Sequence, residues 1–514
     1  MSTAPVKRGP TRRRRRIVAL AAALGLGLLP MTGGAPSASA AGPSDVIAIV
    51  VDGVGNGHGR GMSQWGAYGW AVDHGWSSAQ ILDHYYGGTS SGSIDVNRRI
   101  RVRLTGLDGA GTVGVISHGA GVTWNGQTHA SMQARRNGAG TYDVFAASSI
   151  ACNTALTVPD GPVLKGATGE AVRQIQQFLT QFGFNPGGVD GQFGNLTEAA
   201  VIRFQASRGL GQDGQWRIEE ATAARSMIAA GRTSATFTYI GTSASPRFET
   251  AAGESATTAL GLCQPNGTVT HYRGVLDVVN DAGTTRVVND VRVEDYLRGV
   301  VPKEISASWA VAGSGRGAQA VAAQAVAARS YGLEQNRYSY ASTCDTQSCQ
   351  VYAGSATRTV ATGAATLVED FRTDQAIAAT AGVVRMWNGT TNIVSTEFSA
   401  SNGPRTAGGV FPARDDAPGD STPLNPNHRW TRVLDADELA ARYGLGTLTG
   451  ATMVEAQSSV NQQFDGVWFN DIVLTGTGGT RRIAAWDFRG SQGLPSPGFD
   501  VRVILRDSVG TNVA

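Results

Sequence analysis

The hydrophobic pattern of this 514-residue chain changes its period twice, near residue 161 and again near residue 235. Residues 98–157 alternate polar and apolar side chains, as in RIRVRL at 99–104, with glycine-rich turns between the alternating segments. A period of two is typical of antiparallel strands, and it returns over residues 235–293. We therefore predict the α+β fold class, with strand-rich material interrupted by an insertion of another kind.

The insertion, residues 161–230, has the period of a helix. Within 171–182 one face collects large apolar side chains: Val172, Ile175, Phe178, Leu179 and Phe182. A second helix follows, with Thr197 as its predicted cap and Phe204 on its buried face. The segments VDGQFGNLTEAAVIRFQ and QDGQWRIEEATAARSM both place an Asp-Gly turn before a helix, which is a weak internal repeat. We predict a small, separate helical unit.

The four cysteines of the chain lie at informative positions. Cys152 precedes the helical unit and Cys263 follows it, so a bridge between them would close the base of an inserted domain. Cys344 and Cys349 are close together in the sequence and suit a local loop staple. Four cysteines allow three pairings, and an exported chain can keep disulfides. We predict the pairs Cys152–Cys263 and Cys344–Cys349.

The first 40 residues have the layout of a secretory signal peptide. A basic segment that includes Arg12–Arg16 precedes an apolar run at 17–29 and a small-residue site, Ala-Ser-Ala, at 38–40. The alternative is an uncleaved anchor helix, but the run is short and an AxA site follows it. We expect cleavage after Ala40, a secreted product and no membrane attachment afterwards, because no later segment approaches the ~18 consecutive apolar residues of a membrane span.

The charge balance changes once the signal is removed. The whole chain has 43 basic and 40 acidic residues, a formal net charge of +3. Seven basic and no acidic residues lie in 1–40, which leaves 36 basic and 40 acidic residues, or a net −4, in the remainder. Composition therefore gives no reason to expect a nucleic-acid partner. The remaining 474 residues suggest two or three domains of roughly 150 residues each.

Glu304 is the strongest catalytic candidate by its surroundings. It stands in VVPKEISASW, between Pro302 and Ile305, and an apolar setting disfavours the ionised form of a carboxylate and raises its pKa. A raised pKa suits a general acid near neutral pH. The alternative is an ordinary glutamate in the first turn of a helix, where the helix dipole favours it. An alanine-rich segment, 315–336, follows, and we predict a buried central helix there.

Four segments resemble the SpoIID/LytB family in order and spacing across roughly residues 260–500: VRVEDYLRGVVPKEISASW, AQAVAAQAVAARSYGL, CDTQSCQVYAG and FSASNG. The resemblance implies a mixed strand and helix domain, discontinuous over 45–160 and 235–510. The family includes stage II sporulation protein D, which looks like a lytic transglycosylase acting on peptidoglycan, and LytB-type amidase enhancers. The family's proposed catalytic acid maps onto Glu304. The helix that follows supplies further candidate substrate-binding residues: Gln324, Arg329 and Tyr331.

The resemblance also implies a reaction. A lytic transglycosylase cleaves the β-1,4 bond after N-acetylmuramic acid, and the C6 hydroxyl of that sugar closes a 1,6-anhydro ring. Because the attacking oxygen already belongs to the substrate, one carboxyl group can act first as acid and then as base, unlike the carboxylate pair of most glycosidases. A single prominent glutamate is then sufficient. The family's other implied role is a non-catalytic peptidoglycan-binding protein that stimulates a separate cell-wall amidase.

The helical unit resembles a second family. Residues 164–210, LKGATGEAVRQIQQFLTQFGFNPGGVDGQFGNLTEAAVIRFQASRGL, are similar nearly throughout to the three-helix peptidoglycan-binding-like domain. The resemblance implies a small all-α domain at 161–230 that binds peptidoglycan glycan strands, with these residues in its binding module: Asp190, Gly191, Phe193 and Gly194. The alternative is a structural insertion without a ligand. Both families imply the same polymer, so we predict a location at the cell wall.

The glycine-rich segment GNGHGRGMSQWGAYGWA, at 55–71, lies near the start of the mature chain. In the SpoIID/LytB family a similar motif lies near the C-terminal end of the domain, after a stretch like 488–505. The simplest account is a circular permutation, which predicts that strand 46–52 lies beside strand 499–505. Polar residues of the segment would then reach the site of Glu304 as candidate substrate contacts: His58, Ser63 and Gln64. The alternative is a decorative glycine loop.

We expect neither a metal nor a cofactor. Some members of the SpoIID/LytB family hold zinc through Cys and His in the region of Cys344 and Cys349, but here the second position is Cys, and two ligands do not close a zinc site. A disulfide is favoured over zinc there. The seven histidines are scattered and form no HExxH-like pattern, so a metallo-amidase is not favoured either.

Overall fold

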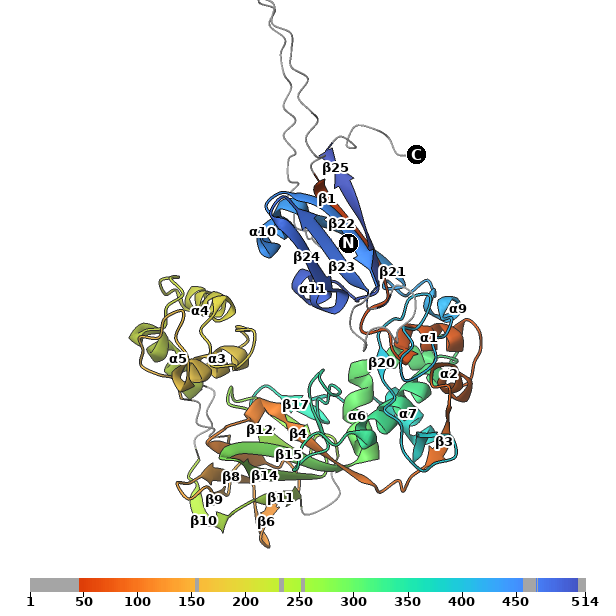
Figure 1. Ribbon diagram of the computed structural model, residues 1–514. Coiled ribbons are helices and arrows are strands. Elements are labelled where there is room, and N and C mark those ends of the chain that lie inside the picture. Colours follow the sequence, from red (N-terminus) through yellow and green to blue (C-terminus); the bar gives the residue numbers. More distant parts are fainter. Residues whose placement is uncertain are drawn as a thin grey trace, which may run out of the picture. The chain divides into compact units, whose positions relative to one another are not determined.

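The computed structural model contains both helices and strands, in agreement with the predicted α+β class (Figure 1). The residues that the structure describes are 46–152, 157–230, 235–250, 255–455, 468 and 470–506. The predicted signal peptide, residues 1–40, lies outside them, as do a few residues at either end of the predicted SpoIID/LytB-like domain. Across the described ranges, no helix combines the length and the apolar character that crossing a membrane requires.

Two large sheets, made mainly of antiparallel pairs, confirm the strand pattern of the sequence. The order in the eight-stranded sheet is β10 (Thr238–Ser243), β9 (Tyr142–Ala147), β8 (Ser131–Arg136), β5 (Thr112–Ile116), β12 (Leu260–Cys263), β13 (Val269–Tyr272), β17 (Ala356–Arg358) and β18 (Ala365–Leu367). The order in the seven-stranded sheet is β16 (Thr343–Cys344), β4 (Arg99–Leu104), β15 (Thr284–Arg292), β14 (Val275–Asp281), β11 (Arg247–Thr250), β6 (Val122–Trp124) and β7 (Gln127–His129). One hydrophobic core, which includes Val102, Val115 and Leu262, is shared by strands of both sheets.

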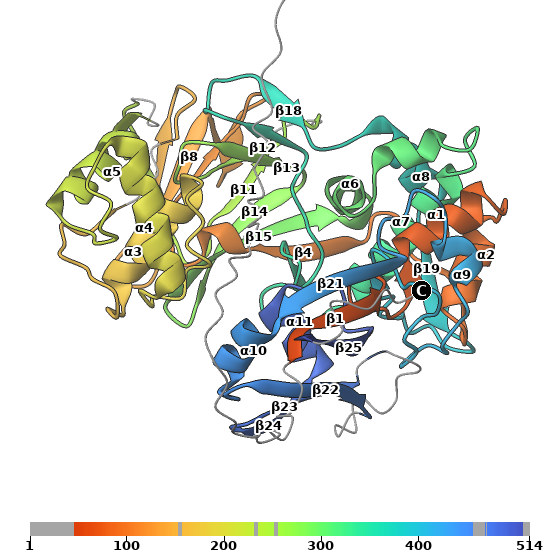
Figure 2. The same ribbon diagram turned by 90° about the horizontal axis from the view of Figure 1, so that it is seen from above.

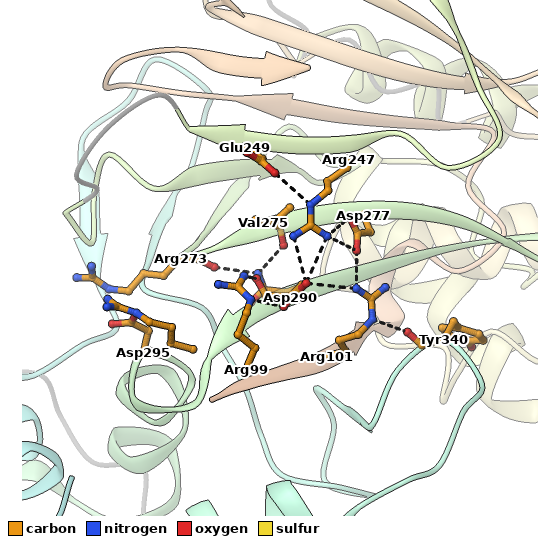
Figure 3. A network of polar contacts seen from close by, with 12 residues as sticks. Arg99, Arg101, Arg247, Glu249, Arg273, Val275, Asp277, Asp290, Asp295 and Tyr340 are labelled. Carbon is orange, nitrogen blue, oxygen red and sulfur yellow. Dashed lines mark hydrogen bonds and ion pairs between the residues drawn. The ribbon is translucent and has the colours of Figure 1, made fainter. Parts of the chain in front are cut away.

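The seven-stranded sheet also carries a network of ion pairs (Figure 3). On β4 the apolar residues are buried, while Arg99 and Arg101 alternate with them, as the sequence pattern predicts. Both arginines bind Asp290 on β15, Arg99 through Nε at 2.6 Å and Arg101 through Nη1 at 3.4 Å. Arg247 on β11 reaches Asp290 at 3.2 Å and shares Asp277 on β14 with Arg101. The two carboxylates therefore tie four neighbouring strands together.

A group of helices packs around α7 (Ala318–Glu334) (Figure 1). Its neighbours are α1 (Gln64–Val72), α2 (Ser78–Tyr85), α6 (Val293–Glu304), α8 (Phe371–Ala379), the 3₁₀ segment η2 (Ala307–Val311) and β19 (Val383–Trp387), which pairs with β3 (Thr89–Ser93). From Ala320 to Ser330 every residue of α7 is buried, because its many alanine side chains let neighbouring elements approach closely. The predicted buried central helix is confirmed.

A three-stranded sheet brings the two ends of the described chain together (Figure 2). β1 (Val46–Val54) lies between β21 (Arg429–Asp435) and β25 (Phe499–Leu505) and is antiparallel to both. The register pairs Val46 with Leu505. The predicted pairing of the two terminal segments is therefore confirmed. Since the start of β1 faces the end of β25, a short link could join them as a hairpin, which is the connection that a circular permutation would have removed.

β1 belongs to a hydrophobic core that it shares with the C-terminal part of the chain. Besides β21 and β25, the elements there are α10 (Ala436–Tyr443), β22 (Leu448–Val454), β23 (Asp471–Gly476), β24 (Gly479–Ala484) and α11 (Ala485–Gln492). Ile49 of β1 is buried in this core with Leu439 and Phe488. The N-terminal strand is therefore a core element and not a peripheral extension.

The inserted unit folds as three helices with a hydrophobic core of its own: α3 (Glu170–Gln181), α4 (Asn195–Arg208) and α5 (Ile218–Ala230). The predicted capping role of Thr197 is wrong. Gly194 is the N-cap residue of α4, and Thr197 lies inside the first turn. Its hydroxyl instead accepts a hydrogen bond of 3.0 Å from the side-chain amide of Gln176.

The weak internal repeat of this unit has a physical basis in two buried glutamines. Gln176 on α3 holds the Asp-Gly-Gln turn at 190–192, and Gln205 on α4 holds the turn at 213–215. In both turns the glutamine amide donates to the aspartate carboxylate and to the last carbonyl of the turn, and it accepts from the glycine N–H. The same amide also donates to a side chain in the first turn of the next helix. The two turns are therefore built alike.

Both predicted disulfides are present. Cys152 and Cys263, on either side of the inserted unit in the sequence, are joined with an S–S distance of 1.95 Å. Cys344 and Cys349 are joined at 2.05 Å. A zinc ion binds thiolates, so the zinc alternative at the second pair has no support in this structure.

Candidate active site

The glycine-rich loop, which lies between β1 and α1, and the segment that contains Glu304 line one pocket of about 600 Å³. Its lining includes Glu304 from the end of α6 and Tyr331 from α7. His58, from the glycine-rich loop, and Gln64, from the start of α1, line the same pocket. Trp486, at the start of α11, completes another part of the wall. The glycine-rich loop thus returns to Glu304, as the permutation interpretation expects.

Glu304 is the last residue of α6, so the alternative of a glutamate in the first turn of a helix is wrong. The C-terminal end of a helix carries the negative end of its dipole, which disfavours a carboxylate. Burial raises the pKa of Glu304 above its ordinary value, and hydrogen bonds from the Val351 N–H and the Gln64 side chain lower it partway back. The Val351 N–H donates to Oε1 at 3.0 Å. The carboxyl group is therefore held in place and biased towards its protonated form.

The glycine-rich loop is tied to the chain beside the pocket by backbone pairing. β2 (Met62–Ser63) pairs in parallel with β20 (Phe398–Ser399). Gly61 has a φ of +65°, and a Cβ there would lie 2.0 Å from the carbonyl oxygen of Glu397. Glycine is therefore required for the loop to approach so closely at this position.

His58 is held within the pocket wall as a neutral side chain. Its Nδ1 lies 3.1 Å from the hydroxyl of Ser399 and accepts from the backbone N–H of Arg60, also at 3.1 Å. Burial lowers the pKa of His58 to about 4, so the imidazole is uncharged at pH 7. The ring can therefore offer hydrogen bonds to a substrate, but it does not act there as a cation.

A second carboxylate, Glu397, lines the pocket and is not among the residues that the sequence singled out. Arg60 holds it with two hydrogen bonds, at 2.9 and 2.7 Å. The two residues are far apart in the sequence, so no local pattern reveals the pair, although Glu397 directly precedes the FSASNG motif. Glu397 pairs through both carboxylate oxygens with the guanidinium of Arg60. Because this pairing favours the ionised form of Glu397, Glu304 is the carboxyl group better suited to proton transfer.

Three predicted substrate contacts lie outside the pocket lining: Ser63, Gln324 and Arg329. Ser63 caps α1 and donates to Asp420 of α9 (Ala417–Asp420) at 2.7 Å. The buried guanidinium of Arg329 binds Glu294 of α6 with two hydrogen bonds, at 2.9 and 2.7 Å. Gln324 is fully buried on α7, and no described residue bonds to its side-chain amide. Ser63 and Arg329 join secondary structure elements, and none of the three side chains lines the pocket.

Aromatic side chains border the acid. Burial raises the pKa of Tyr331, and its hydroxyl accepts a hydrogen bond of 3.3 Å from Arg337. Trp486 is 43% exposed, and the guanidinium of Arg489 lies 5.0 Å from its ring centroid. Rings of this kind give a pocket the apolar faces that an organic ligand buries, while the few polar groups fix its orientation.

Two family models match the chain. Residues 281–387, which contain Glu304 and α7, match the family Stage II sporulation protein. Residues 168–216, within the inserted helices, match the peptidoglycan binding domain family. The chain carries a SpoIID domain and an inserted peptidoglycan-binding domain.

Similar proteins match limited stretches of the chain. The zinc D-Ala-D-Ala carboxypeptidase of Streptomyces albus G is 46% identical over 59 residues, which are 10% of this chain and 22% of that protein. An uncharacterized protein of Brachyspira hyodysenteriae is 40% identical over 62 residues, 12% of this chain and 15% of that protein. The crystal structure of the SleB N-terminal domain is 33% identical, covers 14% of this chain and 96% of that chain, and has a TM-score of 0.13. The chain thus spans less than a quarter of the length of the curated relatives it matches.

In the peptidoglycan-binding domain, the four residues named from the sequence build one turn: Asp190, Gly191, Phe193 and Gly194. Asp190 accepts a hydrogen bond of 2.8 Å from Gln176, and Gly191 has a φ of +75°. Phe193 is buried in the core of the three helices, and Gly194 is the N-cap residue of α4. These contacts give each residue a structural role, and their contact with a glycan stays a prediction.

The two domains together point to a function connected with the cell wall. The disulfides are consistent with an extracellular location. Within the part of the chain that the structure describes, no group of three or more His, Cys, Asp or Glu side chains is placed to hold a metal ion.

Proposed function

We propose that this chain is an exported cell-wall enzyme that cleaves peptidoglycan glycan strands as a lytic transglycosylase. The observation that carries the proposal is the state of Glu304, a pocket-lining carboxyl group whose pKa is raised by burial. Donors from two other segments, Val351 and Gln64, hold it in place. The SpoIID domain that contains Glu304 and the peptidoglycan-binding domain support the same polymer as substrate.

The proposed reaction uses one carboxyl group twice. Protonated Glu304 gives its proton to the oxygen of the β-1,4 bond after N-acetylmuramic acid, and the bond from C1 to that oxygen breaks. The resulting carboxylate then takes the proton of the C6 hydroxyl while the C6 oxygen bonds to C1. The sugar ends in the 1,6-anhydro form, no water is consumed, and Glu304 is protonated again. The bidentate pairing of Glu397 with Arg60 agrees with this scheme, because the scheme needs no second carboxylate.

His58, Gln64 and Tyr331 are the proposed substrate contacts, since they line the pocket with Glu304. A neutral imidazole, an amide and a phenol can hydrogen bond to sugar hydroxyl and acetamido groups without adding charge. We propose that the peptidoglycan-binding domain, over 161–230, keeps the enzyme on its polymer between cleavage events.

The test is digestion of purified peptidoglycan by the mature chain, with the products identified by mass spectrometry. We expect anhydro-muropeptides from the wild type and none from Glu304→Gln, which keeps the size of the side chain but neither donates nor accepts the proton. Glu334→Gln makes the same chemical change at an exposed position on α7 and should leave the products unchanged. Equal product from Glu304→Gln, or no anhydro product from the wild type, would refute the enzymatic proposal.

The second candidate is a non-catalytic peptidoglycan-binding protein that stimulates a separate cell-wall amidase. The observation in its favour is that the inserted helices have a core of their own, so binding does not depend on the pocket of Glu304. This candidate predicts that the wild type and Glu304→Gln raise the rate of an added amidase equally, with no anhydro product from either.

A further inference from the structure

The disulfide between Cys344 and Cys349 borders the pocket of Glu304. Cys349 itself lines the pocket, and two residues later the N–H of Val351 donates to Glu304 at 3.0 Å. Gln347, inside the small loop that the disulfide closes, lines the pocket as well. The disulfide is therefore part of the wall that faces the acid, although the reaction described above makes no use of it.

The chain before the disulfide is fixed to the seven-stranded sheet. Cys344 belongs to β16 and pairs with Arg103 of β4. The next residue, Asp345, accepts hydrogen bonds from the backbone N–H and the hydroxyl of Thr105, at 3.1 and 2.8 Å. Cys344 is thus attached to a rigid element of the fold.

The chain between the two cysteines has a different character. Thr346, Gln347 and Ser348 are exposed, and a backbone bond of 2.9 Å from the Cys349 N–H to the Thr346 carbonyl closes the turn. This bond lies within the loop and does not fix the loop to the sheet. The disulfide ties Cys349 covalently to β16, which pairs with β4. Val351 lies two residues further on, between Gln350, whose side-chain amide donates to the Ala328 carbonyl at 3.0 Å, and Tyr352, whose N–H donates to the Asp345 carbonyl at 3.2 Å. The disulfide therefore adds a covalent constraint to a segment that these hydrogen bonds also hold.

We propose that the Cys344–Cys349 disulfide is a positioning element of the active site, which holds the Val351 amide on the Glu304 carboxyl group and shapes the adjoining wall for the glycan. The inference rests on the proposed function of Glu304 and adds to it a dependence on the oxidised state of one cysteine pair. When a dithiol reduces this disulfide, it supplies two electrons and two protons and closes to its own cyclic disulfide. Cys344 and Cys349 become thiols, and Cys349 loses its tie to β4.

Loss of the Val351 hydrogen bond has a defined electrostatic consequence. The bond stabilises the carboxylate and lowers the pKa of Glu304, which burial raises. Without the bond the pKa is higher, so the pH at which kcat/KM falls on the alkaline side moves up by about one pH unit. A disulfide that served only overall stability would change the amount of folded enzyme and leave this pH unchanged.

The experiment compares two double variants in the full mature chain. Cys344→Ser with Cys349→Ser removes the disulfide at the pocket, and Cys152→Ser with Cys263→Ser removes the other one as a matched control. We expect kcat/KM for anhydro-muropeptide release to drop about tenfold in the first variant, together with the upward shift of the alkaline limb. The control should keep the wild-type pH profile. A wild-type rate and pH profile in the first variant would overturn the inference.

A second measurement decides the matter when the first variant does not fold or when the wild type releases no anhydro product. Hydrogen exchange at the Val351 amide is followed in the Cys152→Ser, Cys263→Ser chain before and after treatment with dithiothreitol, because this chain has one reducible disulfide. We expect at least tenfold faster exchange at Val351 after reduction, with no change at Val287 in the core of the sheet. Unchanged exchange at Val351 would overturn the inference. If this chain shows the faster exchange but the wild type forms no anhydro product, the proposed activity alone is refuted.

Discussion

Asp290→Asn is predicted to weaken the seven-stranded sheet by about 2 kcal/mol. The Asp290 side chain is 12% exposed and pairs with three guanidinium groups, those of Arg99, Arg101 and Arg247, which are 42, 35 and 44% exposed (Figure 3). Ion pairs with such exposed partners contribute roughly 0.2–1 kcal/mol each, and three of them on one carboxylate give the stated sum. The effect concerns the candidate active site, since β15 runs directly into α6, which ends at Glu304.

Native-state hydrogen exchange measures this loss where it acts. Amides of Val287 and Val288, which are buried on β15, should exchange about thirtyfold faster in the variant, because every 1.4 kcal/mol is roughly a factor of ten. Asp281→Asn is the matched control: Asp281 is 35% exposed and pairs with Arg286 at 3.3 Å, so a change of at most about 0.5 kcal/mol is expected. The difference between the variants should shrink in 1 M salt. Equal exchange in both variants would refute the reasoning.

Three further predictions follow from single side chains. Gln64→Ala should move the alkaline fall of kcat/KM to higher pH, because the Gln64 hydrogen bond lowers the pKa of Glu304; an unmoved pH profile would contradict this. His58 has a pKa of about 4 in the folded chain against 6.5 as its ordinary value, so the wild type should lose stability relative to His58→Gln as the pH falls from about 6.5 to 4. Parallel melting temperatures of the two proteins over that range would count against a buried neutral imidazole. Gln205→Leu leaves the polar groups of its Asp-Gly-Gln turn without their amide partner and should destabilise the peptidoglycan-binding domain by about 2 kcal/mol, so that peptidoglycan pull-down fails at a lower temperature than for the wild type; an unchanged temperature would contradict this.

Elements with a strong local period were predictable from the sequence. The alternation at 99–104, the helix at 171–182 and the buried alanine-rich helix are all found, because each pattern reflects burial of one face or of the whole element. The cap at Thr197 was wrong because Gly194 can take the extended conformation of an N-cap residue, while the Thr197 hydroxyl is bound by a glutamine from another helix. A contact of that kind depends on packing and has no local signature.

The candidate site likewise contains residues that local motifs indicate and contacts that only the tertiary structure creates. Glu304, His58, Gln64 and Tyr331 line one pocket, and each lies in a motif that the sequence displayed. The pairing of Arg60 with Glu397 could not be predicted, because its two members become neighbours only through the pairing of β2 with β20. Likewise the sequence could not distinguish the partly exposed Tyr331 from the buried Arg329, since all residues of α7 from Ala320 to Ser330 are buried and its alanine-rich pattern marks no exposed face.

Strand pairing determines where the glycine-rich loop lies in the fold, and the place of the loop in the sequence does not. The loop follows β1, and the pairing of β1 with β25 fixes where the loop begins. This pairing needs no covalent link between the start of β1 and the end of β25. The pairing of β2 with β20 then fixes where the loop ends, next to Gln64 and the carboxyl group of Glu304. Backbone hydrogen bonds at both ends of the loop therefore hold it in place without a covalent connection between β25 and β1. The strand that precedes the loop is itself held in a core, where Ile49 is buried, so the loop that lines the candidate site starts from a fixed position.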